Sequence, residues 1–87
     1  MDKETRFIGN APSELAYWMQ NDPNVCKKIG ALLTDIQRHP FTGLGKPELL
    51  RHRQGWWSRR INNVDRLVYR IEKDVIYVAH CRGHYDN

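Results

Sequence analysis

The last nine residues of this 87-residue chain, AHCRGHYDN, contain more reactive side chains than a chain end normally has. Chain ends are usually polar and poorly ordered. Here His80, Cys81, Arg82, His84 and Tyr85 lie close together in the sequence. Such side chains bind a metal, pack in a core or take part in chemistry, and the rest of the sequence must decide among these interpretations.

A second group of charged and polar residues precedes this tail. Its candidate members are Lys46, Glu48, Arg51, His52, Arg60 and Arg66. RNA carries its own nucleophile, the 2′-hydroxyl. A protein can cleave RNA if it supplies a general base, fixed cations for the charge on the phosphorane and a general acid. Glutamate, arginine and histidine can fill those places, and guanidinium suits a phosphoryl group because its planar donors bond two oxygens at once.

The residue types alone do not select this interpretation. A trio of glutamate, arginine and histidine occurs in many basic domains, and Glu48 taken by itself is most often a solvated loop acid. Trp56 and Trp57 could stack on bases, but buried packing is the more common use of tryptophan.

A metal site is a further interpretation of the tail. Cys81 and His84 have C-x-x-H spacing, with His80 beside them. A structural zinc site needs four ligands, and the remaining cysteine and histidines have no paired spacing. We therefore expect no metal and no cofactor, and we expect Cys81 to be a small buried residue.

The composition indicates one globular domain over residues 1–87. The chain is 40% apolar and 28% charged, which is ordinary for a folded domain. The N-terminus does not resemble a signal peptide, and no stretch is apolar for long enough to span a bilayer. The two cysteines form no disulfide framework, so the cytoplasm is the expected compartment.

The net charge of +4 lies entirely in the second half of the chain. Residues 1–45 contain five Lys/Arg and five Asp/Glu, whereas residues 46–87 contain nine Lys/Arg and five Asp/Glu. This asymmetry indicates an anionic partner that binds the C-terminal half.

The apolar pattern predicts a short strand at residues 5–9, followed by two helices. The first helix covers residues 11–21. The second covers residues 23–38, where one apolar stripe recurs at helical spacing and the pair His39-Pro40 ends the helix. A loop with two glycines and a proline then covers residues 41–48.

Strand patterns follow at residues 49–53, 56–62, 65–72 and 75–81, joined by tight turns. In the third, Leu67, Tyr69 and Ile71 alternate with Arg66 and other residues, which predicts one face on a core and one toward solvent. We therefore predict an α+β domain in which two N-terminal helices pack on one face of a twisted antiparallel sheet. Arg60 is expected on the uncovered face, opposite to Arg59.

Four motifs in order, PFTGLGKPELLRH, GWWSRRI, DRLVYRI and CRGHY, resemble the YoeB/Txe toxins of the RelE superfamily. The resemblance covers residues 23–85. It implies a RelE-like fold and an mRNA interferase, an endoribonuclease that cleaves messenger RNA at the ribosome as the toxin of a type II toxin–antitoxin system and so inhibits translation.

The resemblance also implies residue roles. Glu48 would be the general base, Arg66 would stabilise the phosphorane and His84 would be the general acid, while Tyr85 would orient the RNA. Supporting contacts to the substrate would come from Lys46, Arg51, His52 and Arg60.

Several features depart from the family pattern, among them Arg51, which stands where lysine is usual. Leu49 stands where proline usually follows the glutamate, Asp65 stands where histidine usually precedes the arginine, and Asp86 and Asn87 extend the chain beyond the usual His-Tyr end. We expect these differences to affect the rate more than the function.

The family further implies partners: messenger RNA and the ribosome, a YefM-like antitoxin, a second copy in a homodimer, and operator DNA bound through the toxin–antitoxin complex. No membrane partner is expected. The alternative is a catalytically weak nucleic-acid-binding module that acts as a co-repressor with its antitoxin. This interpretation is supported only by Leu49, Asp65 and the Asp86–Asn87 extension.

Overall fold

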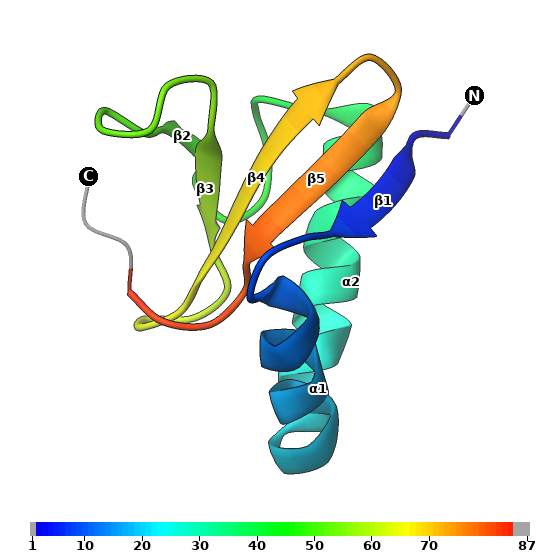
Figure 1. The fold of residues 1–87 in the computed structure, drawn as a ribbon, viewed down its shortest axis with the longest axis vertical. Helices are drawn as coiled ribbons and strands as arrows, with labels where there is room; N and C mark the ends of the chain where they lie inside the picture. Colours follow the sequence, from blue (N-terminus) through cyan, green and yellow to red (C-terminus); the bar gives the residue numbers. More distant parts are fainter. Residues whose placement is uncertain (1, 85–87) are drawn as a thin grey trace.

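The computed structural model describes residues 2–84. Its elements, in chain order, are β1 (Glu4–Phe7), α1 (Ala11–Asn21), α2 (Pro23–Arg38), β2 (Glu48–Leu49), β3 (Trp57–Arg60), β4 (Arg66–Glu72) and β5 (Val75–His80). The five strands form one sheet in the order β1-β5-β4-β3-β2, and the two helices lie against one of its faces (Figure 1). The α+β class with helices on one face is therefore confirmed.

The sheet is mixed rather than wholly antiparallel. Strands β2 to β5 pair antiparallel as expected, but β1 pairs parallel to β5. No hairpin links β1 to β5, because both helices and three strands separate them in the chain. Nothing in the local sequence therefore imposes an antiparallel direction on this pair.

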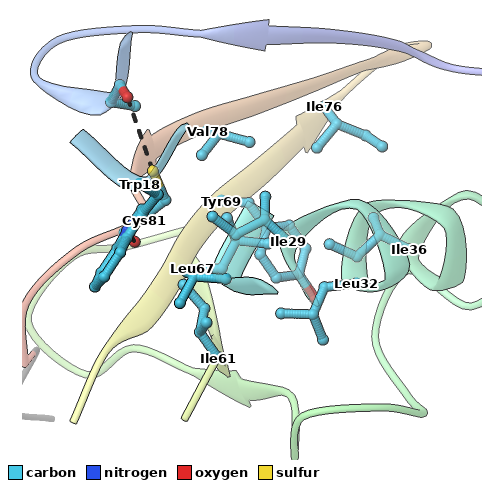
Figure 2. Close-up of a cluster of buried hydrophobic side chains, with 12 residues drawn as sticks. Trp18, Ile29, Leu32, Ile36, Ile61, Leu67, Tyr69, Ile76, Val78 and Cys81 are labelled. Atoms are coloured by element: carbon cyan, nitrogen blue, oxygen red, sulfur yellow. Dashed lines mark hydrogen bonds between the residues drawn. The ribbon is translucent and has the colours of Figure 1, made fainter. Parts of the chain in front are cut away.

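The core lies between the helices and the sheet. The apolar stripe of α2 supplies Val25, Ile29, Leu32 and Ile36, which are all buried, and β4 supplies Leu67 and Tyr69. They form one cluster with Ile76, Val78 and Cys81 from the neighbouring strand and tail, and Figure 2 shows most of these side chains gathered between α2 and the sheet.

The face that the helices leave uncovered, called the open face below, is less solvated than the sequence pattern predicts. Val68 on this face is completely buried, in a small cluster with Leu50, Trp56 and Ala79. The strand predicted at residues 49–53 is wrong beyond its first residue, because β2 ends at Leu49 and the chain then turns back on itself. In this turn the Leu50 amide donates to the Trp56 carbonyl at 2.9 Å, which folds Leu50 and Trp56 over the open face.

Within residues 2–84, neither helix is long and apolar enough to cross a membrane.

Candidate functional site

The register of the central strands places the predicted base and cations on the open face. Glu48 pairs with Ser58, and Ser58 pairs with Val68, so these three form one row across β2, β3 and β4. Two residues further along, Arg60 pairs with Arg66. The intervening residues Trp57, Arg59 and Leu67 face the helices, as strand alternation requires.

Arg60 and Arg66 make an unusual cross-strand pair. Like charges directly opposite each other in an antiparallel ladder are destabilising. Arg60 is exposed and Arg66 is half-buried, and among residues 2–84 neither side chain is in an ion pair with a carboxylate. Two neighbouring guanidiniums of this kind suit an anion with several oxygens, such as a phosphate.

The exposed Glu48 lies at the edge of this site, on the short strand β2. Neighbouring strands are about 4.8 Å apart and residues two apart along a strand are about 7 Å apart. Side chains as long as glutamate and arginine can therefore converge over the space between Glu48 and the arginine pair.

His84 lies near Arg66 because the preceding residue, Gly83, is hydrogen-bonded to the start of β4. The Arg66 amide donates to the Gly83 carbonyl at 3.1 Å, and the Gly83 amide donates to Asp65 Oδ1 at 2.7 Å. The exposed His84 thus follows a residue that is hydrogen-bonded to the start of β4. Tyr85, Asp86 and Asn87 lie outside the described residues, so the role expected for Tyr85 stays a prediction.

The remaining expected contacts lie in the loops beside Glu48. Lys46 is exposed two positions before it, and Arg51 and His52 are exposed in the turn that follows β2. Lys46 has a left-handed backbone, with φ of 53°.

A buried arginine holds the loop that leads into Glu48. Arg59 is completely buried, and its Nη1 donates to Asp35 Oδ2 at 2.5 Å and to the Leu44 carbonyl at 3.0 Å. Its Nη2 donates to the carbonyls of His39, at 2.5 Å, and Thr42, at 2.8 Å. This one side chain on β3 therefore binds Asp35 near the end of α2 and three carbonyls of the segment that follows the helix.

Two further residues complete this loop anchor. The Tyr69 hydroxyl accepts from Arg59 Nε at 3.1 Å and donates to the Pro40 carbonyl at 2.7 Å, and its burial raises the pKa of Tyr69. Asp35 also accepts from the Leu44 amide at 3.0 Å. The hydrogen bond from Arg59, followed by that from Leu44, lowers the pKa of Asp35 below its ordinary value.

The loop also passes close to β3. The Gly45 carbonyl accepts from the Arg60 amide at 2.6 Å, and Gly45 has φ of +78°. A Cβ at this position would lie 2.9 Å from the Arg60 carbonyl oxygen. Glycine is therefore required here by conformation and by space.

Sequence reasoning placed Arg59 off the open face but missed its role as an anchor. Its signal in the sequence is an arginine at a strand position whose neighbours Trp57 and Ile61 face the core. A buried guanidinium needs hydrogen-bond partners for its donors, so such a position indicates a network even before its partners are known.

His80 and Cys81, at the end of β5, each contact a group from α1. The His80 Nδ1 atom lies 3.5 Å from Glu14 Oε2, and the Cys81 thiol lies 3.8 Å from the Ala11 carbonyl oxygen. Burial raises the pKa of Cys81 to about 12, so it is a thiol at neutral pH. Within residues 2–84, no three His, Cys, Asp or Glu side chains gather as metal ligands would.

Known proteins share both the sequence and the fold. Residues 7–85 match the family described as the YoeB-like toxin of bacterial type II toxin–antitoxin systems. Toxin YoeB of Escherichia coli K12 is 49% identical over 70 residues, which cover 79% of this chain and 83% of that protein. Toxin YoeB of Mycobacterium bovis is 38% identical over 84 residues, covering 95% of this chain and 99% of that protein.

Among solved structures, the YoeB dimer from Staphylococcus aureus superposes with a TM-score of 0.92 at 39% identity, over 98% of this chain and 100% of that one. The YoeB–YefM heterotetramer from the same organism superposes with a TM-score of 0.88, also at 39% identity, over 98% and 100% of the two chains. The extent of the sequence match and its agreement with the fold show that this chain belongs to the YoeB family of toxins from bacterial type II toxin–antitoxin systems.

Proposed function

We propose that this toxin is an endoribonuclease that cleaves messenger RNA on the ribosome and so stops translation. The observation that carries the proposal is the cross-strand pair of Arg60 and Arg66 on the open face, between the strand that holds Glu48 and the segment that holds His84. Two adjacent guanidiniums flanked by a carboxylate and an imidazole match the parts that metal-free RNA cleavage needs.

In the proposed reaction, Glu48 takes the proton of the RNA 2′-hydroxyl. The 2′-oxygen attacks the adjacent phosphorus, and the bond from phosphorus to the 5′-oxygen breaks. Arg66, supported by Arg60, stabilises the negative charge on the phosphorane oxygens. His84 gives its proton to the departing 5′-oxygen, which leaves a 2′,3′-cyclic phosphate and a 5′-hydroxyl.

The remaining residues would hold the substrate. Lys46, Arg51 and His52 are exposed beside Glu48 and would contact phosphate or base edges. Tyr85, which follows His84, would orient the RNA by stacking or hydrogen bonding.

The partners of the relatives extend the proposal. Structures from Staphylococcus aureus include a YoeB dimer and complexes of YoeB with YefM. We propose that this chain likewise forms a homodimer in the cytoplasm and is silenced by a YefM-like antitoxin, and that the complex binds its operator DNA. An antitoxin with acidic segments would complement the basic second half of the chain.

A cleavage assay tests the function. Purified wild-type protein, His84→Ala and Glu48→Ala should be incubated with a messenger RNA, with and without ribosomes, and the products mapped. Wild-type protein should cleave the messenger RNA and leave products with a 2′,3′-cyclic phosphate or a 3′-phosphate. Both variants should lose this cleavage. On naked RNA the activity should persist in excess chelator.

Induction in cells provides the second readout. Wild-type toxin should arrest growth and the His84→Ala variant should not. If wild-type induction leaves growth and messenger RNA intact, the enzyme proposal fails, and a nucleic-acid-binding co-repressor becomes the better explanation.

A further inference from the structure

We infer that Asp65 is a positioning residue that holds the His84-bearing segment against Arg66, so that the acid and the phosphate-binding cation keep a fixed relation. The inference rests on the proposed function, because it assumes that His84 is the general acid. Its basis is the hydrogen bond from the Gly83 amide to Asp65 Oδ1, at 2.7 Å. In Figure 1 the segment after β5 passes beside the turn between β3 and β4 where this contact forms.

The Asp65 carboxylate is itself held in place. Its Oδ2 accepts from Asn62 Nδ2 at 3.0 Å, and the Asn62 Oδ1 accepts from the amides of Val64, at 2.8 Å, and Asp65, at 2.7 Å. The Ile61 amide donates to the Asp65 carbonyl at 2.9 Å. Asp65 is only 9% exposed. Both its backbone and its side chain are thus held by contacts that do not involve the tail.

Gly83 is bound through both of its backbone polar groups. Its amide donates to Asp65, and its carbonyl accepts from the Arg66 amide at 3.1 Å. Asp65 and Arg66 thus both bind Gly83, the residue that directly precedes His84. Gly83 has φ of +99°, a conformation that favours glycine, while a Cβ there would meet no atom within 4 Å.

A separate contact secures the chain two residues earlier. The Cys81 amide donates to Glu14 Oε1 at 2.8 Å, and its carbonyl accepts from Trp18 Nε1, also at 2.8 Å. Helix α1 therefore holds the end of β5 without help from Asp65. Loss of the Asp65 carboxylate should leave the tail beyond Cys81 with only the bond from the Arg66 amide to the Gly83 carbonyl, which loosens the tail while the sheet stays intact.

Asp65 could instead serve only to close the turn between β3 and β4. The two roles differ in what they predict for a substrate that needs no acid. An RNA analogue with a better leaving group at the 5′-oxygen bypasses the proton donated by His84. A variant that only misplaces the acid should recover on this substrate, whereas a variant that distorts the whole site should not.

The test compares Asp65→Ala, Asp65→Asn, His84→Ala and Glu48→Ala in single-turnover cleavage. On natural RNA, Asp65→Ala should cleave about 10- to 100-fold more slowly with little change in KM. Asp65→Asn should lose less, because its amide oxygen can still accept from Gly83. On the activated substrate, Asp65→Ala and His84→Ala should both recover to within roughly threefold of wild type, while Glu48→Ala should remain inactive.

Two controls separate positioning from stability. Ile29→Val changes the core beneath the opposite face and should lower the melting temperature without slowing cleavage. Amide hydrogen exchange at Gly83 should be protected in the wild type and fast in Asp65→Ala, a readout that needs no activity.

Unchanged exchange at Gly83, or a cleavage defect in Asp65→Ala that the activated substrate does not relieve, would overturn the inference. If wild-type protein cleaves neither substrate, with or without ribosomes, the proposed function itself has failed, while the exchange measurement still decides whether Asp65 holds the tail.

Discussion

At the scale of single residues, the proposed site rests on two arginines that the fold places next to each other. Arg60 and Arg66 are opposite in the ladder between β3 and β4, an arrangement whose repulsion a bound phosphate would relieve. Arg59, one position earlier, is buried and donates to a carboxylate and to backbone carbonyls. Because side chains alternate along a strand, Arg59 faces the helices and is buried, whereas its neighbour Arg60 is exposed on the open face.

The first prediction concerns Arg66. Arg66→Lys should slow single-turnover cleavage by roughly 10²–10³, a loss of about 3–4 kcal/mol of transition-state stabilisation, because one ammonium cannot bond two phosphoryl oxygens in fork geometry. The matched control is Arg70→Lys on the same strand, where the side chain pairs with Glu72. Near-wild-type turnover of Arg66→Lys would show that its charge suffices and that the fork has no role.

At the scale of elements, the loop before β2 must be held firmly, since β2 has only two residues. The loop is held by Arg59, Asp35 and Tyr69, which come from three different elements. The segment that bears His84 is held separately, at the start of β4. The two groups proposed for proton transfer therefore depend on independent anchors.

The second prediction concerns the acid stability of the loop anchor. Because Arg59 lowers the pKa of Asp35 below its ordinary value of 3.8, this carboxylate stabilises the fold at pH above that value, and the contribution disappears as pH falls through the lower folded-state pKa. Asp35→Asn should therefore destabilise the protein at neutral pH, and its difference from wild type should shrink below about pH 4. Urea unfolding at a series of pH values measures this difference.

Asp74→Asn controls for net charge, since Asp74 lies in the exposed turn between β4 and β5. If the difference between Asp35→Asn and wild type stays constant down to pH 2, the Asp35 carboxylate contributes nothing through its charge.

The local elements could largely be predicted from the sequence, and the long-range contacts could not. The apolar residues of α2 recur at the period of a helix and those of β4 alternate as in a strand. These periods specify the two elements because the apolar positions are the ones that the fold buries. The two-residue length of β2 depends on the Leu50 to Trp56 turn, and the direction of β1 depends on a strand about 70 residues away in sequence. The family resemblance supplied the site residues, but the contacts of Arg59 and Asp65 appear only in the fold.

At the scale of the whole molecule, the main core lies between the helices and one face of a small sheet. Leu32 is completely buried in that core, whereas Leu44 is 50% exposed. The third prediction is that Leu32→Ala costs about 2–5 kcal/mol of unfolding free energy, while Leu44→Ala costs less than about 0.5 kcal/mol. Denaturant unfolding of both variants measures this. Since small domains are stable by only about 5–15 kcal/mol, similar losses in the two variants would mean that the core assignment is wrong.

The parallel pairing of β1 with β5 means that the sheet cannot be completed until β5 has been synthesised. The first strand finds its partner only in the last one, and helix α1 bonds to Cys81 just beyond it. A nascent chain in which β5 has not yet been made therefore has an unfinished sheet, with β1 unpaired and α1 without its contacts to Cys81.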